Sequence, residues 1–249
     1  MEILGIDIGG TGIKGAIVDL DNGALMTERH RLPTPDPSTP AEVAKTVGEM
    51  VRHFRYSGPI GFGFPAVVID GVALTATNIH NDWIQTNVET LFERETGCPC
   101  KVINDADAAG LAEMAVGAGR KVKGVVIVIT VGTGIGSALF TDGRLVPNTE
   151  LGHVIMKEEI AEYWASDAAR KRFDLSWEAW AENFDNYLLY LEKLFNPKLF
   201  VIGGCVISKM DKFEHFLTVE TPIVSALMQN EAGIVGAAFA AESLIMQKH

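Results

Sequence analysis

The sequence lacks the features that mark several large classes of protein. No apolar run approaches the roughly 18 residues that a membrane-spanning helix needs, so we expect no membrane partner. Three cysteines cannot all pair, which argues against a disulfide-stabilised secreted domain. No basic leader precedes the first apolar residues, and we therefore expect a cytoplasmic protein. Lys and Arg number 21 against 32 Asp and Glu, a net charge of −11 that disfavours general binding to nucleic acid.

The most informative stretch is Leu4–Leu20, where a glycine-rich turn joins two apolar runs. The turn consists of Gly9, Gly10, Thr11 and Gly12. Its spacing predicts a strand, a tight turn and a returning strand. Successive N–H groups in such a turn attract anions, and Lys14 adds a positive charge. Asp7 is a candidate ligand for a magnesium ion that carries phosphate. The alternative is an ordinary glycine hairpin at the start of a sheet.

A second copy of this pattern favours the anion-binding interpretation. Ile129–Leu145 aligns with the first copy when Thr133 is set against Thr11, which places Gly134 on Gly12. An internal repeat carries information about the whole fold. We therefore expect two similar half-domains that face a cleft, each supplying one turn to a phosphoryl donor.

Alternating strand and helix signals predict an α/β protein. Thr39 and Asn87 are predicted N-caps, and Ser176 begins a long helix that Pro197 ends. Further helices are expected over 107–118 and about 233–246. Val125–Thr130 is a purely apolar strand, as in a sheet covered on both faces.

Asn104 and Asp105 stand where a short buried strand gives way to a helix. Ligands of α/β sheets bind at the carboxyl ends of strands. An aspartate there can accept the proton of a hydroxyl that attacks phosphorus. The alternative is that Asp105 or Asp107 only caps the helix, which is a common role of aspartate.

These motifs resemble those of the ROK family of sugar kinases, in the actin/hexokinase superfamily, and within it the polyphosphate glucokinases. The resemblance covers D-I-G-G-T-G-I-K-G, G-T-G-I-G, Asn104–Glu113, Pro147–His153 and Gln229–Ala238. It implies an α/β, two-lobed actin-like ATPase (ribonuclease H-like) fold with a central cleft. The expected small N-terminal lobe spans 1–103 plus 234–249, and the expected large C-terminal lobe spans 104–233.

The resemblance also assigns roles to single residues. Asp105 matches the catalytic base, and the expected sugar ligands are Asn78, Asn104, Asp105, Glu150, His153 and Glu162. Glu162 has an alternative role as a solvated charge on a helix face. The expected donor-binding residues are Asp7, Gly9, Gly10, Thr11, Gly12, Lys14, Thr133, Gly134, Gly203 and Gly204.

The implied reaction is transfer of a phosphoryl group from polyphosphate, with ATP as a possible second donor, to the 6-hydroxyl of glucose. Mg²⁺ is the implied cofactor, near Asp7, and a homodimer is expected. No cysteine lies between His153 and Cys205, so the structural zinc of many relatives is not expected. The net charge of −11 counts against a long polyanionic donor. The alternative is a strictly ATP-dependent glucokinase, or another hexose or N-acetylmannosamine kinase.

Two alternatives come from other classes of function. Some ROK proteins are sugar-responsive repressors, but these carry an N-terminal helix-turn-helix, and this sequence begins directly in the first glycine-rich stretch. An inactive sugar-binding relative is the other alternative, and the presence of Asp7, Lys14 and Asp105 argues against it.

Overall fold

The computed structural model describes residues 1–77 and 79–246, and it divides into two compact units. Unit 1 comprises 1–116 and 230–249, and unit 2 comprises 117–229. The boundaries expected from the sequence, 103/104 and 233/234, differ from this division. Helix α3 (Asp105–Ala115) belongs to unit 1 because it packs against helix α7 (Ala232–Ala241) and strand β5 (Ile60–Phe64).

Unit 1 is built on a six-stranded sheet. Its central path runs β3 (Ala24–Leu25), β2 (Ile13–Asp19), β1 (Glu2–Ile8), β5 and β8 (Cys100–Asn104), and β4 (His30–Leu32) also pairs with β2. Strands β1 and β2 form an antiparallel hairpin, whereas β1, β5 and β8 are parallel. The parallel strands therefore end at one edge, which brings Asp7 and Asn104 to the same side of the sheet.

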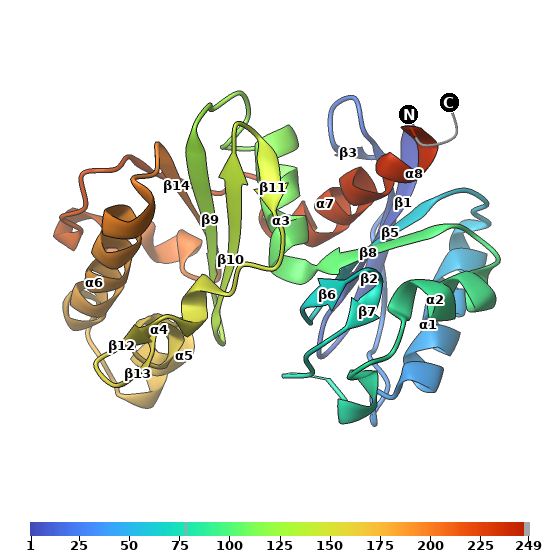
Figure 1. Cartoon of the computed structure of the whole chain (residues 1–249), viewed down its shortest axis with the longest axis horizontal. Coiled ribbons are helices and arrows are strands. Elements are labelled where there is room, and N and C mark those ends of the chain that lie inside the picture. The colour runs from blue at the N-terminus through green and yellow to red at the C-terminus, as the bar shows by residue number, and fades with distance from the viewer. Residues whose placement is uncertain (78, 247–249) are drawn as a thin grey trace. The chain divides into compact units, whose positions relative to one another are not determined.

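Helices cover both faces of this sheet (Figure 1). Helix α1 (Pro40–Phe54) and helix α2 (Val88–Thr96) pack together on one face, over a core that includes Leu4, Ile6 and Phe62. Helices α3 and α7 pack together on the other face.

Helix α7 approaches the sheet closely because two paired positions carry no side chain. Gly5 and Gly61 lie opposite each other in β1 and β5. A Cβ at Gly5 would lie 2.0 Å from the carbonyl oxygen of Ile234, and one at Gly61 would lie 1.7 Å from that of Ala237. Any larger residue would push the helix away from the strands.

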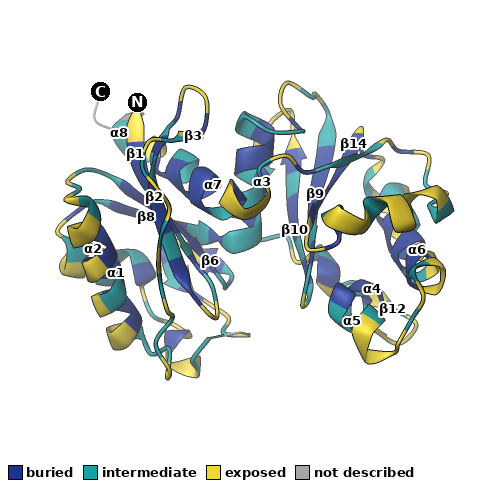
Figure 2. Ribbon diagram, turned by 180° about the vertical axis from the view of Figure 1, so that it is seen from behind, coloured by how far each residue is buried: buried dark blue, intermediate teal, exposed yellow. Residues whose placement is uncertain are grey.

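Unit 2 has a five-stranded sheet in the order β11 (Arg144–Val146), β10 (Ile135–Thr141), β9 (Val125–Val131), β14 (Leu199–Gly204) and β15 (Ile223–Ser225). The hairpin β9–β10 with the parallel neighbour β14 repeats the arrangement of β1–β2 with β5. The predicted repeat is thus confirmed. Helix α6 (Trp177–Phe195) contributes Trp180, Phe184 and Leu188 to the core of this unit. Figure 2 shows buried residues along β9 and on the inner side of α6.

Smaller elements complete the chain. Their bounds are β6 (Val68–Ile69), β7 (Val72–Ala73), β12 (Ile155–Met156), β13 (Glu159–Ile160), α4 (Ala161–Ala165), α5 (Asp167–Arg172), α8 (Ser243–Met246) and the 3-10 turns η1 (Asn81–Trp83), η2 (Leu151–His153), η3 (Ile207–Lys212), η4 (Glu214–Phe216) and η5 (Gln229–Glu231).

Most predicted helix ends are confirmed. Thr39, Asn87 and Ser176 are N-caps whose side chains accept hydrogen bonds from backbone amides. The helix expected over 233–246 is instead two helices, α7 and α8, separated at Glu242. Among the described residues, no helix is both long and apolar enough to cross a bilayer.

Candidate active site

Asp7 and Lys14 lie on adjacent strands beside the first glycine turn. They are directly paired in the β1–β2 register, and Lys14 Nζ lies 3.2 Å from Asp7 Oδ2. The Asp7 side chain also lies against the start of helix α7, where a Cβ at Gly233 would come within 2.8 Å of Asp7 Cγ. The carboxylate is thus fixed on one side by a lysine and accommodated on the other by a glycine.

The first glycine turn is closed by a backbone hydrogen bond from Gly9 N to Gly12 O of 3.1 Å. Two side chains from the segment after the hairpin hold its carbonyls: Thr34 Oγ1 donates to Gly9 O at 2.6 Å, and Arg31 Nη2 donates to Thr11 O at 2.9 Å. Sequence reasoning missed Arg31 and Thr34. No motif surrounds Arg31, whose contact depends on the pairing of β4 with β2. Thr34 begins the stretch T-P-x-P-x-T-P, which resembles the same family but predicts only an extended connection.

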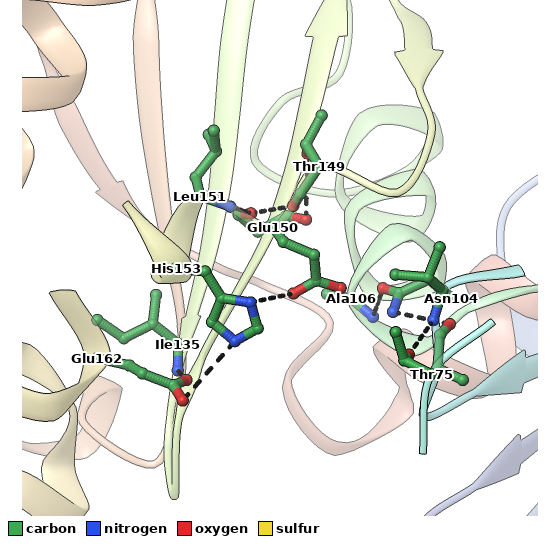
Figure 3. A network of polar contacts seen from close by, with 12 residues as sticks. Thr75, Asn104, Ala106, Ile135, Thr149, Glu150, Leu151, His153 and Glu162 are labelled. Atoms are coloured by element: carbon green, nitrogen blue, oxygen red, sulfur yellow. Dashed lines mark hydrogen bonds and ion pairs between the residues drawn. The ribbon is translucent and has the colours of Figure 1, made fainter. Parts of the chain in front are cut away.

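Asn104 ends β8 and caps helix α3. Its Oδ1 accepts from Ala106 N at 2.8 Å and Asp107 N at 3.1 Å, and its Nδ2 donates to Ala66 O at 3.2 Å (Figure 3). The N-cap of α3 is therefore Asn104, and the alternative that Asp105 or Asp107 caps this helix is wrong.

Asp105 is the first residue of α3 and is half-buried. Its Oδ1 accepts from Ala106 N at 2.8 Å. Asp7 of β1 is paired with Gly63 of β5, and Gly63 is paired with Ile103 of β8. Asp105 follows β8, so it lies at the same end of the parallel strands as Asp7. Neighbouring strands are about 4.8 Å apart, so the backbones that carry these two carboxylates are roughly 10 Å apart. The predicted sugar ligand Asn78 lies outside the described residues.

In unit 2, His153 lies between two glutamates (Figure 3). His153 Nδ1 is 3.9 Å from Glu150 Oε2, and Nε2 is 3.8 Å from Glu162 Oε1. All three side chains are partly exposed, so their polar atoms remain accessible. The structure therefore brings together three of the predicted sugar ligands: His153 lies in η2, Glu150 directly precedes η2, and Glu162 lies in α4.

Two contacts fix this cluster to β10. Glu162 Oε2 accepts from Ile135 N at 3.0 Å, directly after the second glycine turn. The buried Ser137 accepts from Leu151 N at 2.9 Å and donates to Thr149 O, and so positions the segment that carries Glu150. Ser137 was not predicted, because a small polar residue within a strand gives no signal of its partners.

The second glycine turn, with Thr133 and Gly134, is closed by a hydrogen bond from Gly132 N to Gly134 O of 2.9 Å. Gly203 and Gly204 end β14 beside Thr130 and Val131 of β9. The structure thus places the predicted donor residues of unit 2 next to one another. Directly after β14, the backbone amide of Cys205 donates a hydrogen bond to Val131 O of β9 at 2.9 Å.

The remaining cysteines take no part in these clusters. Cys98 and Cys100 are buried free thiols, and Cys100 Sγ donates to Cys98 O at 3.3 Å. Burial raises the pKa of Cys100 to about 12, so this thiol stays protonated and unreactive.

Within residues 1–77 and 79–246, no three His, Cys, Asp or Glu side chains are grouped as a metal ion would require.

Three kinds of comparison relate this chain to known proteins. The family model described as ROK family matches residues 3–163. The polyphosphate glucokinase of Mycobacterium tuberculosis (strain CDC 1551 / Oshkosh) is 46% identical over 237 residues, which cover 95% of this chain and 89% of that protein. The polyphosphate glucokinase of Mycobacterium leprae (strain TN) is 44% identical over 95% of this chain and 73% of its own.

Solved structures agree with this assignment. The inorganic polyphosphate/ATP-glucomannokinase of Arthrobacter sp. strain KM is 47% identical, with a TM-score of 0.90 that covers 100% of this chain and 99% of that one. A ROK family glucokinase from Streptomyces griseus is 24% identical, with a TM-score of 0.82 over 98% and 100% of the chains, and supports the fold alone. The α/β fold of actin-like ATPase type expected from the sequence is confirmed, and the chain belongs to the ROK family.

Proposed function

We infer that this chain is a kinase that transfers the terminal phosphoryl group of polyphosphate to the 6-hydroxyl of glucose, and that ATP serves as a second donor. The single observation that carries this proposal is the arrangement in unit 1. A carboxylate–lysine pair lies beside a glycine turn, and a second aspartate lies at the same strand edge. The relatives at 46% and 47% identity, which are named for polyphosphate, support polyphosphate as the donor.

The proposed chemistry uses Asp105 as the general base. As the sugar oxygen attacks the terminal phosphorus, a new O–P bond forms and the bond from that phosphorus to the rest of the donor breaks. The hydroxyl proton passes to Asp105, and the leaving phosphate chain is one unit shorter. A positioned base of this kind contributes about 10²- to 10⁴-fold to the rate.

Glu150, His153 and Glu162 are proposed to bind sugar hydroxyls. Carboxylates accept hydrogen bonds and an imidazole can both donate and accept, so together they match the paired donors and acceptors of a hexose. The observed cluster supports this role, since His153 lies 3.9 Å and 3.8 Å from the two carboxylates. Asn104 has one amide hydrogen beyond its bond to Ala66, which suits a further sugar contact.

The residues present fit a magnesium ion brought in with the donor. Mg²⁺ is usually held by one or two carboxylates together with substrate phosphates. Asp7 is a single, partly exposed carboxylate beside the first glycine turn, and one of its oxygens, Oδ2, pairs with Lys14 Nζ at 3.2 Å. When bound, the ion would neutralise charge on the donor phosphates.

The homodimer and the cytoplasmic location expected from the sequence stay predictions.

A donor panel tests the proposed reaction. Purified protein with glucose should form glucose 6-phosphate with polyphosphate, and also with ATP. Equal or better rates with ATP and none with polyphosphate would favour the strictly ATP-dependent alternative. Mannose and N-acetylmannosamine in place of glucose test the acceptor in the same assay.

The Asp105→Asn variant tests the base. We expect turnover to fall by about 10²-fold or more, while glucose binding measured by calorimetry stays near the parent value. Asp211→Asn, which removes the same charge from an exposed position in unit 2, is the matched control and should keep full activity. Turnover near the parent rate in Asp105→Asn would contradict the assignment.

A further inference from the structure

A row of three charged residues crosses the sheet of unit 1 beside the first glycine turn. Asp7 of β1 is paired with Lys14 of β2, and Lys14 is paired with Arg31 of β4. Directly paired residues in neighbouring strands point to the same face, and like charges in such pairs are destabilising. Asp7 already pairs with Lys14 at 3.2 Å. The row therefore carries a surplus positive charge that an anion would offset.

The guanidinium of Arg31 lies directly over the turn. Its Nη2 donates to Thr11 O at 2.9 Å. A Cβ at Gly12 would lie 2.6 Å from Arg31 Nε, 2.7 Å from Nη2 and 2.8 Å from Cζ. The guanidinium thus occupies the space that a side chain at position 12 would fill.

The carbonyl groups of the turn are hydrogen-bonded whereas several of its amides are not, and this difference favours the binding of anions. The carbonyl oxygens of Gly9, Thr11 and Gly12 are all engaged, by Thr34 Oγ1, by Arg31 Nη2 and by Gly9 N. The amides of Gly10, Thr11 and Gly12 have no acceptor among the described residues. Successive N–H groups of this kind form a concavity that binds anions.

We propose that Arg31 is a donor-binding residue: its guanidinium, held over Gly12, binds phosphate groups of the polyphosphate donor together with the amides of the turn. A guanidinium has five N–H donors and binds phosphate in a bidentate manner, and Arg31 uses one nitrogen for Thr11. Lys14 contributes a point charge that Asp7 partly neutralises, so Arg31 is the less compensated cation. This assignment rests on the proposed function for the identity of the anion.

The alternative is that Arg31 only stabilises the turn. The two roles differ in what they predict for Arg31→Gln, which removes the charge and keeps an amide donor. A purely structural arginine predicts a lower melting temperature with unchanged anion affinity of the folded protein. A donor-binding arginine predicts weaker anion binding at a similar melting temperature.

Calorimetric titration of the full chain with tripolyphosphate, without glucose, decides between them. We expect Arg31→Gln to weaken binding about tenfold, as the loss of a charge-assisted hydrogen bond implies. Arg29→Gln is the matched control, since Arg29 also lies exposed before β4 but donates to Asn230 O at 3.4 Å; its affinity should stay within about twofold of the parent, a margin well below the loss of one such bond. Equal affinities for the two variants would overturn the proposal.

This binding assay does not depend on turnover. If the parent chain binds tripolyphosphate through Arg31 but does not phosphorylate glucose, the proposed function fails and the anion site stands. If the parent phosphorylates glucose with polyphosphate and Arg31→Gln leaves the KM for polyphosphate unchanged, the arginine assignment fails and the proposed function stands.

Gly12→Ala gives a second, independent test. The backbone at Gly12 is not in the left-handed region, so alanine is tolerated there, but its methyl group would displace the flexible end of Arg31. We expect Gly12→Ala to bind tripolyphosphate as weakly as Arg31→Gln, and the double variant to be no weaker than either. Fully additive losses would show that the two residues act independently, which contradicts the proposed contact.

Discussion

Asn104 performs two structural tasks that its predicted role in sugar binding does not require. It caps helix α3 through Ala106 N and Asp107 N, and it joins β8 to the segment after β5 through Ala66 O. The side chain is 7% exposed, so both tasks are carried out away from bulk water. A single substitution can therefore change stability and sugar affinity together, and two variants are needed to separate them.

Asn104→Ala removes the cap and should lower the free energy of unfolding by about 1 kcal/mol or more, as lost caps usually do. Asn104→Asp keeps a carboxylate acceptor at the helix N-terminus, where negative charge is favourable, but it loses the amide donor. We expect Asn104→Asp to retain more of the stability and to bind glucose more weakly than the parent. Urea unfolding and glucose titration measure the two effects. A fully stable Asn104→Asp variant with unchanged glucose affinity would exclude Asn104 as a sugar ligand.

At the level of single residues, the sequence predicted the glycine turns and Lys14 because these residues form a local pattern. It did not predict Arg31, which lies in the strand His30–Leu32 without any motif around it. The contact of Arg31 with Thr11 spans 20 positions and depends on the register of β4 against β2. Such a register is set by tertiary packing, which the local sequence does not encode.

Helix α6 shows the same division between local and long-range information at the scale of an element. Its start at Ser176 and its end before Pro197 followed from capping and proline rules. The polar contacts of this helix could not be predicted from such local rules. Asp185 accepts from Thr218 N at 2.7 Å and Glu192 accepts from Thr221 N at 2.6 Å, so one helix holds the segment that leads into β15.

Glu192 makes this anchoring dependent on pH. Partial burial of the carboxylate raises its pKa, but hydrogen bonds from the Thr221 hydroxyl and from the amides of Thr221 and Glu220 outweigh that effect, and the net pKa is lowered from 4.5. A lowered folded-state pKa means that the stabilisation is fully present above the unfolded value near 4.5 and is lost as the pH falls through the folded-state pKa.

Glu192→Gln should therefore lower the free energy of unfolding at pH 7 by about 1 kcal/mol, the usual net contribution of one hydrogen bond. The difference between variant and parent should shrink as the pH falls from the unfolded value of 4.5 through the lowered folded-state pKa, because the parent carboxylate becomes protonated over that range. Urea unfolding midpoints of the two proteins at neutral and acidic pH measure this. A difference that is the same at both pH values would show that the charge of Glu192 does not contribute.

At the scale of the whole molecule, the repeat predicted from two glycine-rich stretches corresponds to two units with similar hairpins. The sequence located the hairpins well, since both turns are closed by backbone hydrogen bonds between the predicted glycines. It placed the unit boundary before α3, whereas the structure places it after Val116. The assignment of α3 depends on its packing against α7, which is more than 100 positions later in the chain.

Sugar binding should be visible in the unfolding of the whole chain, because a ligand that binds only the folded state stabilises it by mass action. At about 100 times its Kd, glucose should add about 2.7 kcal/mol. For a chain of this size that corresponds to a rise in melting temperature of roughly 5–10 °C. Differential scanning fluorimetry with glucose and with galactose, which differs only at the 4-hydroxyl, measures the shift and its selectivity. Asp105→Asn should show a similar shift, because the amide preserves the shape of the side chain while removing the base. If glucose does not raise the melting temperature of the parent protein, this chain does not bind the proposed acceptor.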